Sequence, residues 1–323
     1  MSAQSRAELR TAAAHWDQAF QDRASAEKRS AYYALASPLY QKLYFNRQFS
    51  DDGTDWLEWV KRTLAPKVPF ERALFLGCGL GDALFDIHRR GIARRLHGID
   101  LSREAIARAN QMVEREGAQK SVSFEVGDFH TCALEEGAYD IAFMVGSLHH
   151  ALDLDRVLGR VRSALKPAGT FVANEYIGPS RWQYTTLQLL LVKALLTLLP
   201  RRLRRRPDGS VKGRIGRPTL EWMLATDPSE AAHSAQIPER FEQFFELTQR
   251  VDFGGAITLP VLDEIVANFR EEARGDMAWL RAIIALDRIA WRTGLVKSAN
   301  AVLVGRARVA TLQSEPARYL STG

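Results

Sequence analysis

The chain has 323 residues, of which 46% are hydrophobic and 25% are charged, and these are ordinary proportions for a globular protein. Its two cysteines, Cys78 and Cys132, are too few for a disulfide framework or a four-ligand zinc site. The net charge of +6 is local, because residues 201–217 contain eight arginines and lysines and one acid, whereas the rest of the chain is nearly neutral. Such a concentrated patch argues against a whole-surface contact with nucleic acid.

Two helices are predicted before residue 70. Residues 6–35 are rich in alanine and place Trp16 and Phe20 on an apolar face. Residues 54–64 form a shorter amphipathic helix that ends before Pro66. The first residues lack the apolar core of a signal peptide, so we expect a cytoplasmic protein.

From residue 73 the pattern alternates between buried strands and amphipathic helices. The predicted strands are residues 73–76, 95–99, 122–126, 139–145 and 170–175, and the predicted helices are residues 82–90, 102–116 and 154–165. Repeated strand–helix alternation predicts a doubly wound α/β fold, with a parallel sheet and a ligand crevice at the carboxyl ends of the strands.

The regular alternation of predicted strands and helices ends after residue 176. An apolar helix at 187–199 and a basic loop come first, and D-P-S-E at residues 227–230 predicts a capping box that starts another helix. Helices around 262–272 and 277–291 then separate two late strands at 244–251 and 301–304. We therefore divide the chain into an N-terminal helical lid (1–69), a core (70–176), a helical insertion over an acceptor (177–242), the end of the core sheet (243–309) and a tail (310–323).

A glycine-rich turn follows the first core strand. Gly77, Gly79 and Gly81 alternate with larger residues, and a turn of this kind lets backbone N–H groups approach a ligand closely. Asp100 ends the next strand, where a carboxylate can accept both hydroxyls of a ribose. Asp128 and Phe129 follow the third strand, where an acid can accept an adenine amino group and an aromatic ring can stack on the base.

Five segments in this order resemble the class I S-adenosylmethionine-dependent methyltransferases over residues 70–176: L-F-L-G-C-G-L-G-D, H-G-I-D-L-S, V-G-D-F, Y-D-I-A-F and L-K-P-A-G-T-F. The resemblance implies a Rossmann-like, mostly parallel seven-stranded sheet whose last strand inserts antiparallel. It implies S-adenosylmethionine as the cofactor, with the glycine loop at its amino-acid end, Asp100 at the ribose and Asp128 at the adenine. The cofactor site that it implies consists of Gly77, Cys78, Gly79, Gly81, Asp100, Leu101, Asp128, Phe129 and Gly146.

The predicted catalytic residues follow the fourth and fifth strands. Methyl transfer to a hydroxyl needs an aligned nucleophile and a proton acceptor, and His149 and His150 are candidate bases. Many small-molecule members of the resembled family carry a similar pair of histidines. Either histidine could instead pack against the loop. Glu175 could orient a histidine, bind an acceptor hydroxyl or cap a helix.

The segment E-Y-I-G-P-S-R-W-Q at residues 175–183 is similar to a subgroup of bacterial methyltransferases of glycan and secondary-metabolite pathways. That similarity implies an acceptor pocket formed by Tyr176, Arg181, Trp182 and Gln183, although the same residues could simply anchor the start of a helix. The expected function is O-methylation of a small-molecule or glycan-like acceptor, without a metal ion. A lipid or quinone-like acceptor at a membrane surface and a non-catalytic scaffold are the alternatives.

Thirteen largely apolar residues at 187–199 lead into the basic segment, and they are too short to cross a bilayer. Three interpretations stay open: a lid helix with a solvated basic loop, an interfacial membrane contact made by the leucines and arginines of 187–206, or binding of an anionic acceptor. RNA is the weakest form of the third interpretation, because no accessory RNA-binding motif accompanies the arginines.

Overall fold

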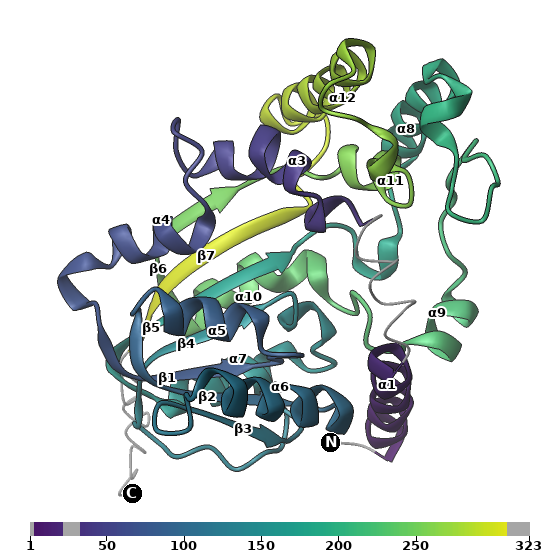
Figure 1. Cartoon of the computed structure of the whole chain (residues 1–323). Helices are drawn as coiled ribbons and strands as arrows, with labels where there is room; N and C mark the ends of the chain where they lie inside the picture. The colour runs from purple at the N-terminus through teal and green to yellow at the C-terminus, as the bar shows by residue number, and fades with distance from the viewer. Residues whose placement is uncertain (1–2, 22–32, 309–323) are drawn as a thin grey trace, which may run out of the picture.

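The computed structural model describes residues 3–21 and 33–308, so the predicted tail at 310–323 lies outside the described residues. Its centre is a seven-stranded sheet with the order β3-β2-β1-β4-β5-β7-β6 (Figure 1). Strand β7 runs antiparallel to both β5 and β6, while the pairs among β1 to β5 are parallel. The predicted fold class is therefore confirmed, including the late antiparallel strand. The strands are β1 Phe70–Leu76, β2 Ala93–Asp100, β3 Val122–Val126, β4 Tyr139–Val145, β5 Leu165–Tyr176, β6 Phe245–Asp252 and β7 Asn300–Ala307.

Helices cover both faces of the sheet. On one face, side chains of α4, α5 and α6 form a hydrophobic core with β1, β2 and β4, and Phe45 and Phe49 extend this core. On the other face, α7 and α10 pack against β4, β5 and β7, with Phe171, Phe241 and Phe245 in mutual contact. The helices on the two faces are α4 Trp56–Thr63, α5 Asp82–Arg89, α6 Arg103–Glu116, α7 Leu154–Ala164 and α10 Ile237–Phe244.

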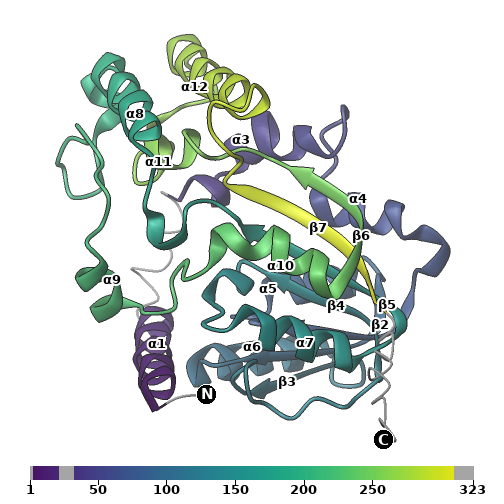
Figure 2. The same cartoon turned by 180° about the vertical axis from the view of Figure 1, so that it is seen from behind.

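A third hydrophobic cluster joins α8, α11 and α12 to residues 34–44, and Figure 2 shows these helices grouped at one end of the molecule. The buried carboxylate of Asp287 holds this group together, because it accepts N–H groups from Gly255, Ile257 and Thr258 and the hydroxyl of Tyr44. The remaining helices are α1 Ala3–Gln21, α3 Pro38–Tyr40, α8 Thr186–Leu198, α9 Leu220–Thr226, α11 Thr258–Leu262 and α12 Arg274–Arg292.

Three sequence predictions about helices are wrong. The helix expected at 6–35 is not continuous to residue 35, because α1 is described over Ala3–Gln21 and residues 34–36 form a separate 3₁₀ turn, with residues 22–32 outside the described part. Residues 262–272 follow α11 as turns rather than as a helix, since α11 ends at Leu262. The D-P-S-E segment is a turn that follows α9, because the Asp227 carboxylate accepts the N–H and hydroxyl of Ser229 and α10 starts only at Ile237.

Candidate active site

A cavity of 340 Å³ lies at the carboxyl ends of the parallel strands. Eight of the nine predicted cofactor residues line it: Gly77, Cys78, Gly79, Asp100, Leu101, Asp128, Phe129 and Gly146. The ninth, Gly81, precedes α5 in a left-handed conformation and packs against Phe85 and Phe124. The glycine loop and three strand ends thus converge on one space, as the alternating pattern predicts.

The backbone conformation of the glycine loop favours glycine at positions 77 and 79. Gly77 has a φ of +68°, and a Cβ atom there would lie 2.3 Å from the Cβ of Ser147. Gly79 has a φ of +52°, and the nearest atom to a Cβ there would be the ring of Phe20 at 3.9 Å. The second glycine therefore presents bare backbone to the cavity, which suits close approach of a ligand.

Asp100 connects the loop to the second strand. One carboxylate oxygen accepts the N–H of Gly79 at 2.8 Å, and the other accepts the N–H of Ser102 at 2.9 Å. Burial raises the pKa of Asp100, although both hydrogen bonds oppose this shift. A carboxylate offers about four acceptor positions, so Asp100 can accept ribose hydroxyls beside its backbone N–H partners.

Asp128 also lines the cavity, but its oxygens already have protein partners. One oxygen accepts the backbone N–H of His130 at 2.8 Å and lies 2.7 Å from the Nδ1 of its ring, and the other accepts the hydroxyl of Thr131 at 3.0 Å. Burial acts to raise the pKa of Asp128, and the hydrogen bonds from His130 lower it overall. Its role at an adenine stays a prediction.

Cys78 is a buried wall of the cavity. Burial raises the pKa of its thiol well above the usual value, and the nearby Asp100 carboxylate acts in the same direction. The thiol therefore stays protonated and serves packing rather than nucleophilic chemistry.

The first helix supplies a wall that the motifs do not reveal. Leu9, Ala12, Trp16 and Phe20 of α1 line the cavity. The Asp17 carboxylate accepts the hydroxyl of Ser102 at 2.5 Å, which docks α1 on the start of α6. The amphipathic pattern of α1 is visible in the sequence, but no local sequence pattern predicts which surface its apolar face packs against.

Glu175 organises the turn that carries both histidines. Its side chain is 1% exposed. One oxygen accepts the N–H groups of Ser147 at 2.9 Å and Leu148 at 2.7 Å, and the other lies 2.7 Å from Nδ1 of His149. Burial alone would lower the pKa of His149, but the hydrogen bond and charge of Glu175 raise it overall. Nδ1 is thus engaged, and Nε2 of His149 is left for chemistry.

His150 lies beside it and lines the cavity. Its Nδ1 lies 3.0 Å from the hydroxyl of Ser229, and the edge of Trp16 meets its ring at 5.4 Å between centroids. Burial lowers the pKa of His150 well below its ordinary value, and the neighbouring His149 adds to this effect. His150 is therefore neutral near pH 7.

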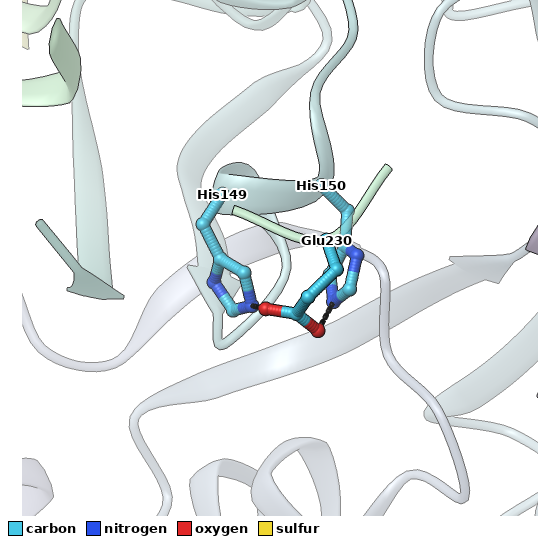
Figure 3. Close-up of side chains that lie close together, drawn as sticks. All are labelled: His149, His150 and Glu230. Carbon is cyan, nitrogen blue, oxygen red and sulfur yellow. Dashed lines mark ion pairs between the residues drawn. The ribbon is translucent and has the colours of Figure 1, made fainter. Parts of the chain in front are cut away.

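Glu230 faces both histidines, as Figure 3 shows. Its two carboxylate oxygens lie 3.7 Å from Nε2 of His149 and 3.7 Å from Nε2 of His150. Together with Asp227 and Ser229, Glu230 is a site residue that the sequence interpretation missed. The letters D-P-S-E were the available signal, and their helix-capping interpretation concealed it.

The predicted acceptor residues gather around the same turn, where they have protein partners. Arg181 donates from its backbone N–H to the carbonyl of Ala231 at 2.7 Å and from its guanidinium to the carbonyl of Pro228. The amide of Gln183 donates to the carbonyls of Arg181 and Pro218 at 3.0 Å each, and the ring of Tyr176 meets His149 edge to face. Trp182 follows Arg181 in the same turn and is half-buried. Their contact with an acceptor stays a prediction.

Comparison with known proteins agrees with this geometry. Residues 71–205 match the family model described as a methyltransferase domain. The chain is 28% identical to the sterol 24-C-methyltransferase of Schizosaccharomyces pombe, over 46% of this chain and 41% of that protein. It is 26% identical to the 2-phytyl-1,4-naphtoquinone methyltransferase of Trichormus variabilis, over 46% of this chain and 65% of that protein. The matched segment thus spans less than two thirds of either relative.

A solved structure shares the fold. Phosphoethanolamine N-methyltransferase 2 of Haemonchus contortus, in complex with S-adenosyl-L-methionine, superimposes with a TM-score of 0.50 at 16% identity, covering 91% of this chain and 60% of that one. The cofactor fits the donor set described above, because bare glycine backbone and an acid at the second strand end face one cavity. Residues 71–205 thus match a methyltransferase domain, and the cavity that they form fits S-adenosylmethionine as the cofactor.

Proposed function

We propose that this protein transfers a methyl group from S-adenosylmethionine to a hydroxyl of a small-molecule acceptor, glycan-like acceptors included. The observation that carries the proposal is the pairing of His149 with the buried Glu175, because it orients one imidazole beside the cofactor cavity through Nδ1 and leaves Nε2 with no hydrogen bond to the described residues. An imidazole oriented in this way through Nδ1 is suited to take a proton at Nε2. The cofactor supplies the electrophilic methyl group on its sulfonium.

Different groups of site residues have different roles in the proposed reaction. Asp100 and the glycine loop bind the cofactor, and Trp16 and Phe20 of α1 exclude water from its cavity. Glu175 fixes His149, and the turn at 179–183 is hydrogen-bonded to residues 227–231, which contact both histidines. In this scheme the acceptor hydroxyl gives its proton to Nε2 of His149 as its oxygen attacks the methyl carbon.

Calorimetry and a product assay test the proposal in two steps. The full chain should bind S-adenosylmethionine, and release of S-adenosylhomocysteine should follow when phenols, sugars or prenylated quinols are offered as acceptors. Glu175→Gln should lower turnover at unchanged cofactor affinity, whereas the exposed Glu239→Gln should change neither. A chain that does not bind the cofactor at high micromolar concentration would instead be a scaffold.

A second candidate function is methylation of a lipid or quinone-like acceptor at a membrane surface. One observation favours it: Leu187, Leu190 and Leu198 of α8 are 40%, 59% and 66% exposed. Their spacing places them on one side of the helix. Exposed Leu220, Trp222 and Leu224 of α9 follow in the chain, and the two relatives named above act, by name, on a sterol and a naphthoquinone.

The arginines beside these leucines are partly engaged. Arg202 pairs with Asp276 and Arg206 with Glu264, while Arg201, Arg205 and Arg214 form no ion pair with any residue of the described ranges 3–21 and 33–308. None of the helices in those ranges is both long and apolar enough to span a bilayer. The leucines and free arginines instead have the composition of an interfacial contact.

Sedimentation with vesicles containing anionic phospholipid tests this second candidate. The double variant Leu190→Ser and Leu198→Ser should bind vesicles less than the wild type. Leu295→Ser is the matched control, since Leu295 is 60% exposed but lies outside α8 and α9. If the wild type stays in the supernatant, the membrane candidate is rejected and the small-molecule proposal stands.

A further inference from the structure

We propose that His149, His150 and Glu230 bind one divalent transition-metal ion, of which Zn²⁺ is the best fit, close to the cofactor cavity. Two imidazoles and one carboxylate form a ligand set that catalytic zinc sites use, with a further position left open. No metal ion is expected from the sequence, because no local pattern places Glu230 next to the histidines. The chemical role of the ion depends on the proposed methyl-transfer function. Binding of the ion does not depend on it.

The three ligand atoms converge on one point. One ring nitrogen from each histidine and a carboxylate oxygen of Glu230 all lie within 4.8 Å of one another. Each histidine Nε2 is 3.7 Å from a Glu230 oxygen, which is longer than a hydrogen bond. Ligands placed about 2.0–2.2 Å from one ion are themselves roughly 3 to 3.5 Å apart, so an ion between them needs only a small closure.

The Nδ1 atom of each histidine has a hydrogen-bonding partner, as is usual for histidines that bind a metal through Nε2. Nδ1 of His149 meets Glu175 at 2.7 Å, and Nδ1 of His150 meets the Ser229 hydroxyl at 3.0 Å. Ser229 in turn donates to Asp227 at 2.6 Å. A carboxylate or hydroxyl on the far nitrogen fixes the ring and directs the other nitrogen toward a metal. Both free nitrogens point toward Glu230 (Figure 3).

The local charge favours a cation. Glu175 and Asp227 are buried, Glu230 is 18% exposed at its side chain, and Arg181 is the arginine whose charge acts on Glu230. Three carboxylates thus surround two histidines with one arginine nearby. In addition, Oδ2 of Asp227 is buried and has no hydrogen-bond partner among the described residues. Buried carboxylates are costly unless they are paired or face a metal ion.

Backbone strain is concentrated at the same place. Ala231, next to Glu230, has a φ of +49°, and its carbonyl accepts the N–H of Arg181, whose own φ is +53°. Non-glycine residues in this region cost about 1–3 kcal/mol each and persist where the surroundings fix them, which happens most at functional sites. The strained pair holds residue 230 against the histidine turn.

In the proposed reaction the ion would take over activation of the acceptor. The acceptor hydroxyl would occupy the open position, and its pKa would fall enough for its proton to pass to water. The oxygen lone pair then forms the bond to the methyl carbon, and the electron pair of the breaking C–S bond stays on sulfur. The products are the methyl ether, S-adenosylhomocysteine and one proton.

Titration of the untagged, full-length chain with Co²⁺ and Zn²⁺ tests the site without any turnover. Binding of Co²⁺ should produce the visible absorption bands of a four- or five-coordinate ion, and Zn²⁺ should displace it. Glu230→Gln should abolish the bands. Glu175→Gln, which changes the group that orients His149 and its turn, should weaken Zn²⁺ binding about 10- to 100-fold. Glu239→Gln is the exposed control and should bind like the wild type.

The outcomes separate the two proposals. If the wild type binds the cofactor but shows no Co²⁺ bands, or if Glu230→Gln retains them, the metal site is rejected while methyl transfer stands. If the metal binds but the cofactor does not, the proposed function fails and the site survives. Ser229→Ala guards against misfolding of Glu230→Gln: it keeps all three ligands, removes the hydroxyl that contacts Nδ1 of His150 and donates to Asp227, and should weaken Zn²⁺ binding in a chain that still unfolds cooperatively.

Discussion

Gly77 lies against Ser147 so closely that a Cβ atom on the glycine would stand 2.3 Å from the Cβ of the serine and 2.8 Å from its hydroxyl oxygen. The Ser147 hydroxyl also donates to the carbonyl of Leu76 at 2.8 Å, so the glycine loop and the histidine turn are joined at one point. The glycine loop and the turn that carries the two histidines therefore share a contact that depends on the absence of a side chain at Gly77.

We expect Gly77→Ala to displace the histidine turn and to lower both cofactor affinity and melting temperature. Gly91→Ala is the matched control, because Gly91 has a similar φ of +62° but open space around its Cβ position. Calorimetry and thermal denaturation of the two variants separate the close contact from the backbone strain that both share. Equal losses in the two variants would show that strain alone is responsible.

Asp100→Asn should weaken binding of S-adenosylmethionine by about 10- to 100-fold, because a charge-assisted hydrogen bond contributes about 1.5–3 kcal/mol. Its amide oxygen can still accept one of the two backbone N–H groups that Asp100 holds. The ribose assignment is checked with adenosine and 2′-deoxyadenosine in calorimetry. Wild type should prefer adenosine and the variant should not; an unchanged preference would move the ribose elsewhere.

Asp17→Ala should loosen the first helix and raise the dissociation rate of the cofactor several-fold, because α1 loses its hydrogen bond to Ser102 and lines the cavity. Stopped-flow displacement of bound S-adenosylhomocysteine measures that rate. Arg10→Ala changes an exposed residue of the same helix and should leave the rate unchanged. Equal rates in Asp17→Ala and the wild type would show that α1 does not restrain the cofactor.

The unfolding free energy should depend on pH through Asp263. Burial raises the pKa of its carboxyl to about 6, the nearby Glu264 adds to this, and the Ala34 N–H and Lys212 oppose it. The folded state then holds a proton that the unfolded state releases near pH 4, so this stabilising contribution is complete below pH 4 and is lost as pH rises through 6.

Asp263→Asn should flatten that slope, since its amide oxygen can still accept the Ala34 N–H. The side chain is only partly buried, so we expect a difference of roughly 1–2 kcal/mol between pH 4 and pH 7. Urea unfolding of both proteins at the two pH values measures it. Parallel pH profiles would show that Asp263 titrates normally.

Local sequence patterns are sufficient to predict much of the core fold. Residue spacing alone predicts the glycine turn and the position of Asp100. The structure brings them to one cavity, because the carboxyl ends of parallel strands meet at one edge of a sheet. The antiparallel β7 came from a family resemblance, since no local pattern reports the partner of a strand.

The rest of the site depends on contacts between distant segments. Trp16 and Glu230 both face His150, yet they lie more than 200 residues apart, and no local pattern predicts that they meet. Asp227 shows the difficulty well: a D-x-x-E spacing stabilises either a helix start or a tight turn, and the packing of residues 227–231 against Arg181 decides in favour of the turn.

Under the proposed function, the position of Glu230 has a consequence for how this protein could diversify. His149, His150 and Glu175 belong to the matched domain at 71–205, but Glu230 comes from the segment beyond it, together with residues that close the acceptor side. An exchange of that segment alone would replace the acceptor pocket and one member of the reactive cluster in a single event. Methyl donor recognition would be inherited unchanged, while acceptor choice and acceptor activation would be exchanged as a unit.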